Sequence, residues 1–215
     1  MNTIKSIFSF LFVAMIAASF TSCKSDDPKP TLTATTFSNL AADPPSGGYN
    51  PNNGQPIGVT KKFTFFSFKS GAIVANADSA STKWDVGFNG TGIIVNSGTS
   101  GPGTAAAQVV TGIFDELLTA PDAGYLTDNK SVSPAFYAIT RGSGNGWYSY
   151  NPSTNIITPI AGRVLVFKTA DGKYAKMEIL NYYKDAPTSP TSSSVDRYYK
   201  FRYIYQPDGS KKLSN

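Results

Sequence analysis

The sequence predicts an all-β protein built as an antiparallel sandwich with little helix. Short runs rich in β-branched and aromatic residues recur after residue 59, and Gly, Pro, Asn and Ser separate them. One pair of these runs flanks Asp171-Gly172, a turn dipeptide that supplies the positive φ a tight hairpin needs. Only one segment has the spacing of an amphipathic helix. Many short strands joined by tight turns are typical of antiparallel sandwiches.

Residues 1–22 have the pattern of an export signal. Lys5 supplies the positive charge, and the apolar run at 7–18 is shorter than the ~20 residues that a membrane helix needs. The tetrapeptide FTSC at 20–23 resembles a bacterial lipoprotein cleavage site, which predicts acylation of Cys23 and anchoring of the protein in a membrane. An ordinary secretory signal followed by an unrelated cysteine is the alternative.

The remaining chain divides at a change of composition. Residues 23–58 contain six prolines and the stretch GGYNPNNG without sustained periodicity, which predicts a tether and an irregular N-terminal segment. The KSDDPKP sequence at its start is similar to the acidic tract of Bacteroidetes lipoproteins that face outward from the outer membrane. Residues 59–215 form the expected β domain. Within it we expect strands at 61–68, 92–96, 162–169, 173–179 and 198–205.

Local patterns refine this fold. Trp84, Val86 and Phe88 alternate, which predicts a half-buried strand with Trp84 in the core rather than stacked on a ligand. The QPDG sequence at 206–209 indicates a second hairpin turn, and residues 108–120 have helical spacing.

The composition excludes most enzyme chemistry. The 215 residues include no histidine and one cysteine, so histidine-based triads and common zinc sites cannot form within the chain. No serine lies in a GxSxG motif, and GTSGPG at 98–103 lacks the lysine of a phosphate-binding loop. Asp115-Glu116 is predicted to be solvated rather than a catalytic pair. Although the net charge is +5, the basic residues are scattered, which does not support nucleic-acid binding.

Three segments carry a resemblance to known proteins: KWDVGFNGTGIIVNSGTSGPG at 83–103, residues 145–185, and YYKFRYIYQPDG at 198–209. Together they resemble the HmuY-like haem-binding lipoproteins of Bacteroidetes. The resemblance implies a hand-shaped all-β fold that holds one haem between two projecting elements. It also implies capture of haem from host haemoproteins or the surroundings, and delivery to a TonB-dependent outer-membrane transporter.

The residues can be weighed separately as a haem site. Haem iron takes His, Met, Cys or Tyr as axial ligands, and Met177 is the only methionine after the signal. Alternation with Ala175 and Ile179 places Met177 in the core more readily than on iron. Tyr137 and Tyr148 flank a glycine-rich loop at 140–146 and could contact a ligand. Tyrosine side chains could form the walls of a haem site, since 11 of the 12 tyrosines lie in the second half of the chain. These are Tyr125, Tyr137, Tyr148, Tyr150, Tyr174, Tyr182, Tyr183, Tyr198, Tyr199, Tyr203 and Tyr205.

The candidate haem-binding residues are therefore Tyr137, Tyr148 and Met177, with no metal ligand assigned. Coordination by two histidines or two methionines of the mature chain is impossible. We expect a surface-exposed, non-enzymatic lipoprotein of the outer membrane that binds haem or another porphyrin for iron acquisition. The alternative is a carbohydrate- or protein-binding adhesion module, in which exposed aromatic residues stack on sugars. The absence of histidine favours adhesion, and the ordered resemblance favours haem.

Overall fold

The structure is a computed structural model that describes residues 32–214. The expected signal and Cys23 lie outside the described residues. In the described part, no helix is long and apolar enough to cross a membrane.

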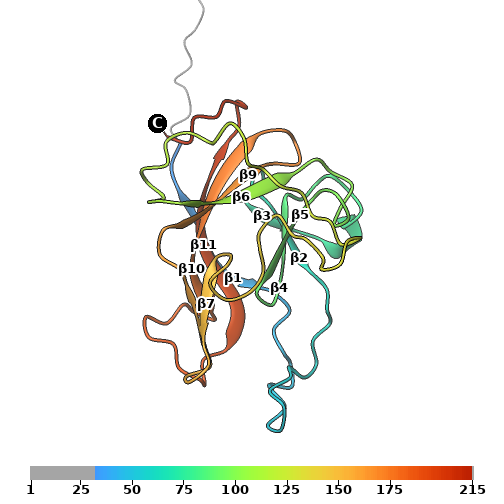
Figure 1. The fold of residues 1–215 in the computed structure, drawn as a ribbon, viewed down its shortest axis with the longest axis vertical. Helices are drawn as coiled ribbons and strands as arrows, with labels where there is room; N and C mark the ends of the chain where they lie inside the picture. The colour runs from blue at the N-terminus through green and yellow to red at the C-terminus, as the bar shows by residue number, and fades with distance from the viewer. Residues whose placement is uncertain (1–31, 215) are drawn as a thin grey trace, which may run out of the picture. The chain divides into compact units, whose positions relative to one another are not determined.

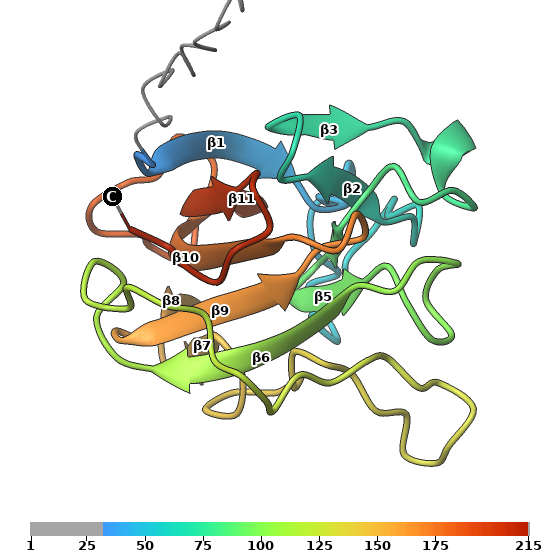
Figure 2. The same cartoon turned by 90° about the horizontal axis from the view of Figure 1, so that it is seen from above.

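Eleven strands and one short 3-10 helix, η1 (Asn76–Asp78), are present among residues 32–214, and the strands form three antiparallel sheets (Figure 1). The five-stranded sheet has the order β1-β11-β10-β9-β6, which Figure 2 shows side by side. The four-stranded sheet has the order β3-β2-β4-β5, and β7 and β8 form a separate hairpin. The strands are β1 (Thr35–Ala41), β2 (Thr64–Ser67), β3 (Ala72–Val74), β4 (Val86–Asn89), β5 (Gly92–Val95), β6 (Ala106–Thr111), β7 (Tyr148–Asn151), β8 (Ile156–Pro159), β9 (Arg163–Lys168), β10 (Tyr174–Tyr183) and β11 (Asp196–Gln206).

The predicted all-β, antiparallel fold is confirmed, and each of the five expected strands is present. The β9–β10 hairpin turns at Asp171-Gly172, and Gly172 has a φ of 75°. One part of the N-terminal prediction is wrong. Residues 35–41 are not irregular, because β1 pairs along β11, with a register shift between Phe37 and Leu40.

The main core lies between the five-stranded and four-stranded sheets. Phe66 lies edge-on to Phe201 at 5.2 Å between ring centroids, and Phe68 packs on Phe167 at 4.9 Å. Met177 and Ile179 belong to this core, as the alternation predicted. Aromatic rings that interlock in this way contribute more than their buried area alone.

Trp84 is completely buried, as predicted, but its neighbours differ from those expected. Strand β4 begins at Val86, so the alternation does not extend back to Trp84. Val86 and Phe88 join the main core, whereas Trp84 packs on Phe65, at 4.4 Å between ring centroids, in a separate cluster. The indole N–H donates to the carbonyl of Ser79 at 2.9 Å.

The predicted helix at 108–120 does not form. Its first residues belong to β6, which pairs with β9, because β-branched residues suit a strand better than a helix. A single turn follows, in which the N–H groups of Glu116 and Leu117 bond to the carbonyl of Ile113. The buried Lys176 ammonium donates to the carbonyls of Phe114 and Leu117 at 2.6 and 3.0 Å, which satisfies groups that a continuing helix would use.

The prediction of a second hairpin at 206–209 is also wrong. The chain turns there, but the residues that follow β11 form an isolated bridge between Lys212 and Thr119 rather than a strand paired with β11.

Three buried aspartates fix loops to the sheets. Asp85 accepts backbone N–H bonds from Phe68 and Ala170, both at 2.8 Å, and thereby links the two large sheets. Asp128 accepts from Val95 and Ala138 at 3.0 and 2.9 Å. Asp43 holds the segment before β2 through bonds from the backbone of residues 60 and 61. Loops held this firmly can position side chains for binding.

Candidate ligand-binding site

Two segments project at one end of the described unit (Figure 1). One is the loop at 44–60, which leads from β1 to β2. The other combines the β7–β8 hairpin with the ends of β10 and β11. A cavity of about 450 Å³ lies between them, within the usual size range of ligand pockets. We call it the tyrosine cleft. Its aromatic and apolar lining is Tyr49, Tyr150, Ile157, Tyr182 and Tyr183, and its remaining lining is Gly54, Thr91, Asn155, Thr191, Ser192, Ser194, Asp196 and Arg197.

The sequence folds into this cleft for local reasons. Tyr182 and Tyr183 end β10, beyond the region where β9 covers that strand. The Tyr183 hydroxyl accepts a hydrogen bond from the Ile157 N–H at 2.9 Å, which ties the β7–β8 hairpin to the main sheet. The Tyr150 hydroxyl donates to the Asn155 side chain at 2.7 Å. The aromatic wall is therefore held by hydrogen bonds as well as by packing.

Tyr49 closes the cleft from the opposite loop. Its hydroxyl donates to the Asp196 carboxylate at 2.6 Å, although the two residues are 147 positions apart. Burial raises the pKa of Tyr49, and the bond to Asp196 raises it further, whereas the nearby Arg197 guanidinium acts in the opposite direction. In the free protein Tyr49 is therefore a neutral phenol whose proton points at a carboxylate.

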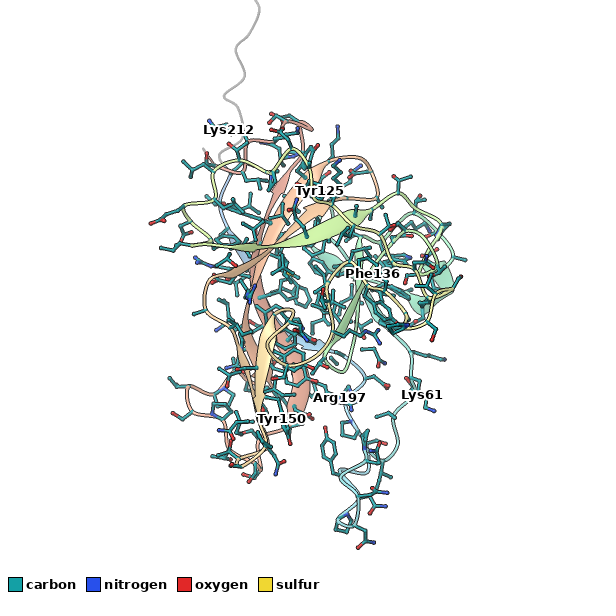
Figure 3. The ribbon with its side chains drawn as sticks, in the orientation of Figure 1. Lys61, Tyr125, Phe136, Tyr150, Arg197 and Lys212 are labelled. Carbon is teal, nitrogen blue, oxygen red and sulfur yellow. The ribbon has the colours of Figure 1, made fainter. Side chains whose placement is uncertain are left out.

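Arg197 stands where the tyrosine cleft meets a second cavity. Its φ of 62° lies in the left-handed region, which costs a non-glycine residue on the order of 1 kcal/mol. The guanidinium donates to the carbonyl of Asp43 at 3.0 Å, and Arg197 and Thr91 line both cavities. Figure 3 labels Arg197 and Tyr150 at this end of the unit, and Tyr125 and Lys212 at the other.

The second cavity, of about 430 Å³, is strongly cationic. We call it the basic cleft; it is lined by Lys130, Tyr137, Arg141 and Arg197 around the β4–β5 turn at 89–92. The Arg141 guanidinium lies 3.6 Å from the centroid of the Tyr137 ring, a cation–π contact. No Asp or Glu is among the described residues that line this cleft.

The structure separates the three residues that the sequence singled out. Tyr137 lines the basic cleft. Tyr148 lies at its border, because its hydroxyl is 3.4 Å from the Thr91 hydroxyl and its ring packs on Trp147. Both tyrosines thus lie near the β4–β5 turn. Met177 is fully buried between Leu165 and Tyr203 and lines neither cleft.

Sequence reasoning missed Tyr49 as a site residue because it assigned that segment to an irregular tether. The signal that could have found it was the aromatic residue inside GGYNPNNG, because a large aromatic side chain is unusual in a polar loop that is fully solvated. For Tyr150, Tyr182 and Tyr183 the sequence predicted only that tyrosines of the second half could form the walls of a haem site. Residues 32–214 contain no group of three or more Cys, Asp or Glu side chains placed to hold a metal ion.

Comparison with known proteins identifies the family. The model of the HmuY protein family matches residues 59–203, which is more than half of the chain. The chain belongs to the HmuY family. The matched range includes Tyr150, Asp196, Arg197 and the basic cleft, whereas Tyr49 lies before it. No curated protein matches the chain.

Solved structures with a similar chain path include HmuY-type proteins. A protein from Bacteroides vulgatus that is named as HmuY-like and haem-binding has a TM-score of 0.47 and 15% identity, covering 83% of this chain and 94% of its own. The apo HmuY analogue of Tannerella forsythia has a TM-score of 0.46 and 17% identity, covering 85% of this chain and 100% of its own. The family assignment rests on the family model.

Proposed function

We propose that this protein binds haem or a related porphyrin in the tyrosine cleft and catalyses no reaction. The observation that carries the proposal is the cleft itself, in which aromatic side chains from two projecting segments face one cavity. A porphyrin needs apolar walls, and four tyrosine rings and Ile157 supply them in this cleft. Membership of the HmuY family supports the same ligand.

Tyr49 is the phenol best placed to bind iron. The residue is 45% exposed, and Asp196, which accepts its hydroxyl proton in a hydrogen bond, would take that proton if the oxygen bound iron. Tyr137 and Tyr148 are proposed contacts at the border of the site. Coordination by Tyr49 gives a high-spin, tyrosinate-type ferric spectrum, and the sharp low-spin spectrum of two axial histidines is not expected.

Absorbance titration of the protein with haemin and with iron-free protoporphyrin tests this proposal. We expect both to bind at micromolar concentration. Tyr49→Phe should abolish the tyrosinate signature and weaken haemin, while protoporphyrin binding changes little. Tyr205→Phe is a matched control, because Tyr205 donates to Asp171 at 2.7 Å and lines neither cleft. Failure of both porphyrins to bind at micromolar concentration contradicts the proposal.

The location of the protein is part of the same proposal. We propose that Cys23 is acylated, that the anchor holds the protein on the outward face of the outer membrane, and that haem taken from host haemoproteins passes to a TonB-dependent transporter. The FTSC and KSDD sequences support the anchor and its outward orientation. Radiolabelled palmitate should enter the wild-type protein and not Cys23→Ala, and external protease should release the domain from intact cells. Label that persists in Cys23→Ala would contradict lipidation.

An adhesion module that binds carbohydrate or protein is the second candidate. Tyr49 and Tyr150 remain 45% and 42% exposed, and exposed aromatic rings also stack on sugars. A glycan or host protein that binds when neither porphyrin does would favour this function.

A further inference from the structure

The basic cleft carries positive charge that the described part of the chain does not neutralise. Some surface cations elsewhere have carboxylate partners, such as Lys83 with Asp78 and Arg202 with both Asp115 and Glu178. No such partner pairs with Lys130 or Arg141 among residues 32–214. Like charges that line one cavity repel each other, so their arrangement favours an anionic ligand.

The β4–β5 turn is shaped to let both guanidiniums approach it. A Cβ atom added at Gly92 would lie 3.0 Å from the Arg141 guanidinium, and one added at Gly90 would lie 3.7 Å from that of Arg197. Because Gly90 also has a φ of 53°, a side chain there would be strained as well. A side chain at Gly92 would therefore crowd the Arg141 guanidinium, whereas at Gly90 the contact distance is ordinary and the positive φ is what favours glycine.

The two clefts adjoin, since Thr91 and Arg197 line both. One cleft is aromatic and the other is cationic, so together they match a flat apolar molecule with acidic groups along one edge. A porphyrin with two free propionates has this distribution. Asp196 in the tyrosine cleft repels carboxylates, which disfavours the reversed orientation.

We propose that the basic cleft is the carboxylate-binding half of the porphyrin site, with Arg141, Lys130 and Arg197 holding the propionates. This inference rests on the proposed function and adds a specificity: porphyrins with free propionates are selected over their esters. Arginine binds a carboxylate through two parallel hydrogen bonds, and such charge-assisted bonds are stronger than neutral ones. The hydrogen bond from the Arg197 guanidinium to the carbonyl of Asp43 holds the shared cation at the boundary of the two clefts.

Protoporphyrin and protoporphyrin dimethyl ester distinguish the two halves of the site. We expect wild-type protein to bind the free acid at least about tenfold more tightly than the ester in a fluorescence titration at low ionic strength. Added salt should weaken binding of the free acid and leave the ester unchanged. In Arg141→Gln and in Lys130→Gln, the preference should fall severalfold through loss of free-acid affinity, while ester affinity stays constant.

Arg163→Gln serves as the matched control, because Arg163 lines neither cleft, and it should keep the wild-type preference. Both clefts lie on the surface, and the melting temperature of each variant shows whether it folds. Equal binding of acid and ester by wild-type protein overturns this inference and leaves porphyrin binding intact. A preference that survives in the Arg141→Gln, Lys130→Gln double variant also overturns it. If neither the free acid nor the ester binds, the proposed function itself is overturned.

Discussion

Strands β10 and β11 run through two regions with opposite properties. Near the Asp171-Gly172 turn they lie in the core, where Met177 and Tyr203 are buried between sheets. At their other ends, Tyr183 and Arg197 face the clefts. The same kind of hydrogen-bonded pair occurs at both ends, Tyr205 with Asp171 and Tyr49 with Asp196. Residue type alone therefore does not define a binding site. What differs between the two ends is which segments of the chain pack around the pair.

The surroundings of each pair explain the difference. Asp171 also accepts from the Thr169 hydroxyl at 2.6 Å and lies 3.8 Å from Lys69, so its carboxylate has further partners from its own turn and from the segment after β2. Tyr49 reaches Asp196 from a separate loop, with the cavity between the two segments. A contact across a cavity can open for a ligand at lower cost than one that joins neighbouring strands of a packed sheet.

The largest expected difference between core and cleft is in stability. Trp84→Ala removes a completely buried ring and should lower the free energy of unfolding by about 3–5 kcal/mol. Tyr150→Ala, in the cleft, should cost about 1 kcal/mol or less because the ring is 42% exposed. Urea titration of both variants measures this, and equal midpoints would show that the cleft is as firmly packed as the core.

A second prediction compares two buried aspartates as the pH changes. Burial raises the pKa of Asp85 above its ordinary value of 3.8, despite the bonds from Ala170 and Phe68. Burial also acts to raise the pKa of Asp43, but hydrogen bonds from Thr60, Lys61 and Asn89 together lower it. The two carboxyls should titrate on opposite sides of 3.8 in a carbon-13 NMR experiment.

The two shifts have opposite consequences for stability. For Asp85 the folded state binds the proton more tightly than the unfolded state, so its contribution is present at low pH and is lost as pH rises through the raised pKa. For Asp43 the contribution is present above the unfolded pKa and is lost as pH falls through the lowered pKa. Asp85→Asn and Asp43→Asn should therefore change the slope of stability against pH in opposite directions. Slopes that change in the same direction contradict this assignment.

The smallest expected effect concerns the hairpin that forms one wall of the cleft. Tyr183→Phe leaves the Ile157 N–H without its acceptor and should cost about 1 kcal/mol. Hydrogen exchange should accelerate at residues 148–159 while the amides of β9 keep their protection, because the lost bond joins only the hairpin to the sheet. Faster exchange throughout the sheets would instead indicate a global loss of stability.

Local patterns predicted much of the fold. The β9–β10 hairpin and the burial of Met177 followed from alternation and one turn dipeptide, because both depend on residues close in sequence. The prediction of a helix at 108–120 failed because these residues pair with β9, more than fifty residues away, and this pairing overrides the helical spacing of the local sequence.

The site was less predictable than the fold. Tyr137 and Tyr148 do lie near a cavity, but the contact between Tyr49 and Asp196 joins residues far apart in the chain and has no local signature. The basic cleft likewise gathers Lys130 and Arg141 from separate loops and Arg197 from the start of β11. Scattered charges in a sequence can therefore form one concentrated site in the fold.

The central claim is that the porphyrin lies between the two projecting segments. Its most direct test is an NMR titration of protein with carbon-13-labelled tyrosine rings against iron-free protoporphyrin, whose ring current shifts nearby signals. We predict large shifts for Tyr49, Tyr150 and Tyr183 and unchanged signals for Tyr174 and Tyr205, which line neither cleft. Shifts confined to Tyr174 and Tyr205, or no shift at saturating porphyrin, would contradict the account.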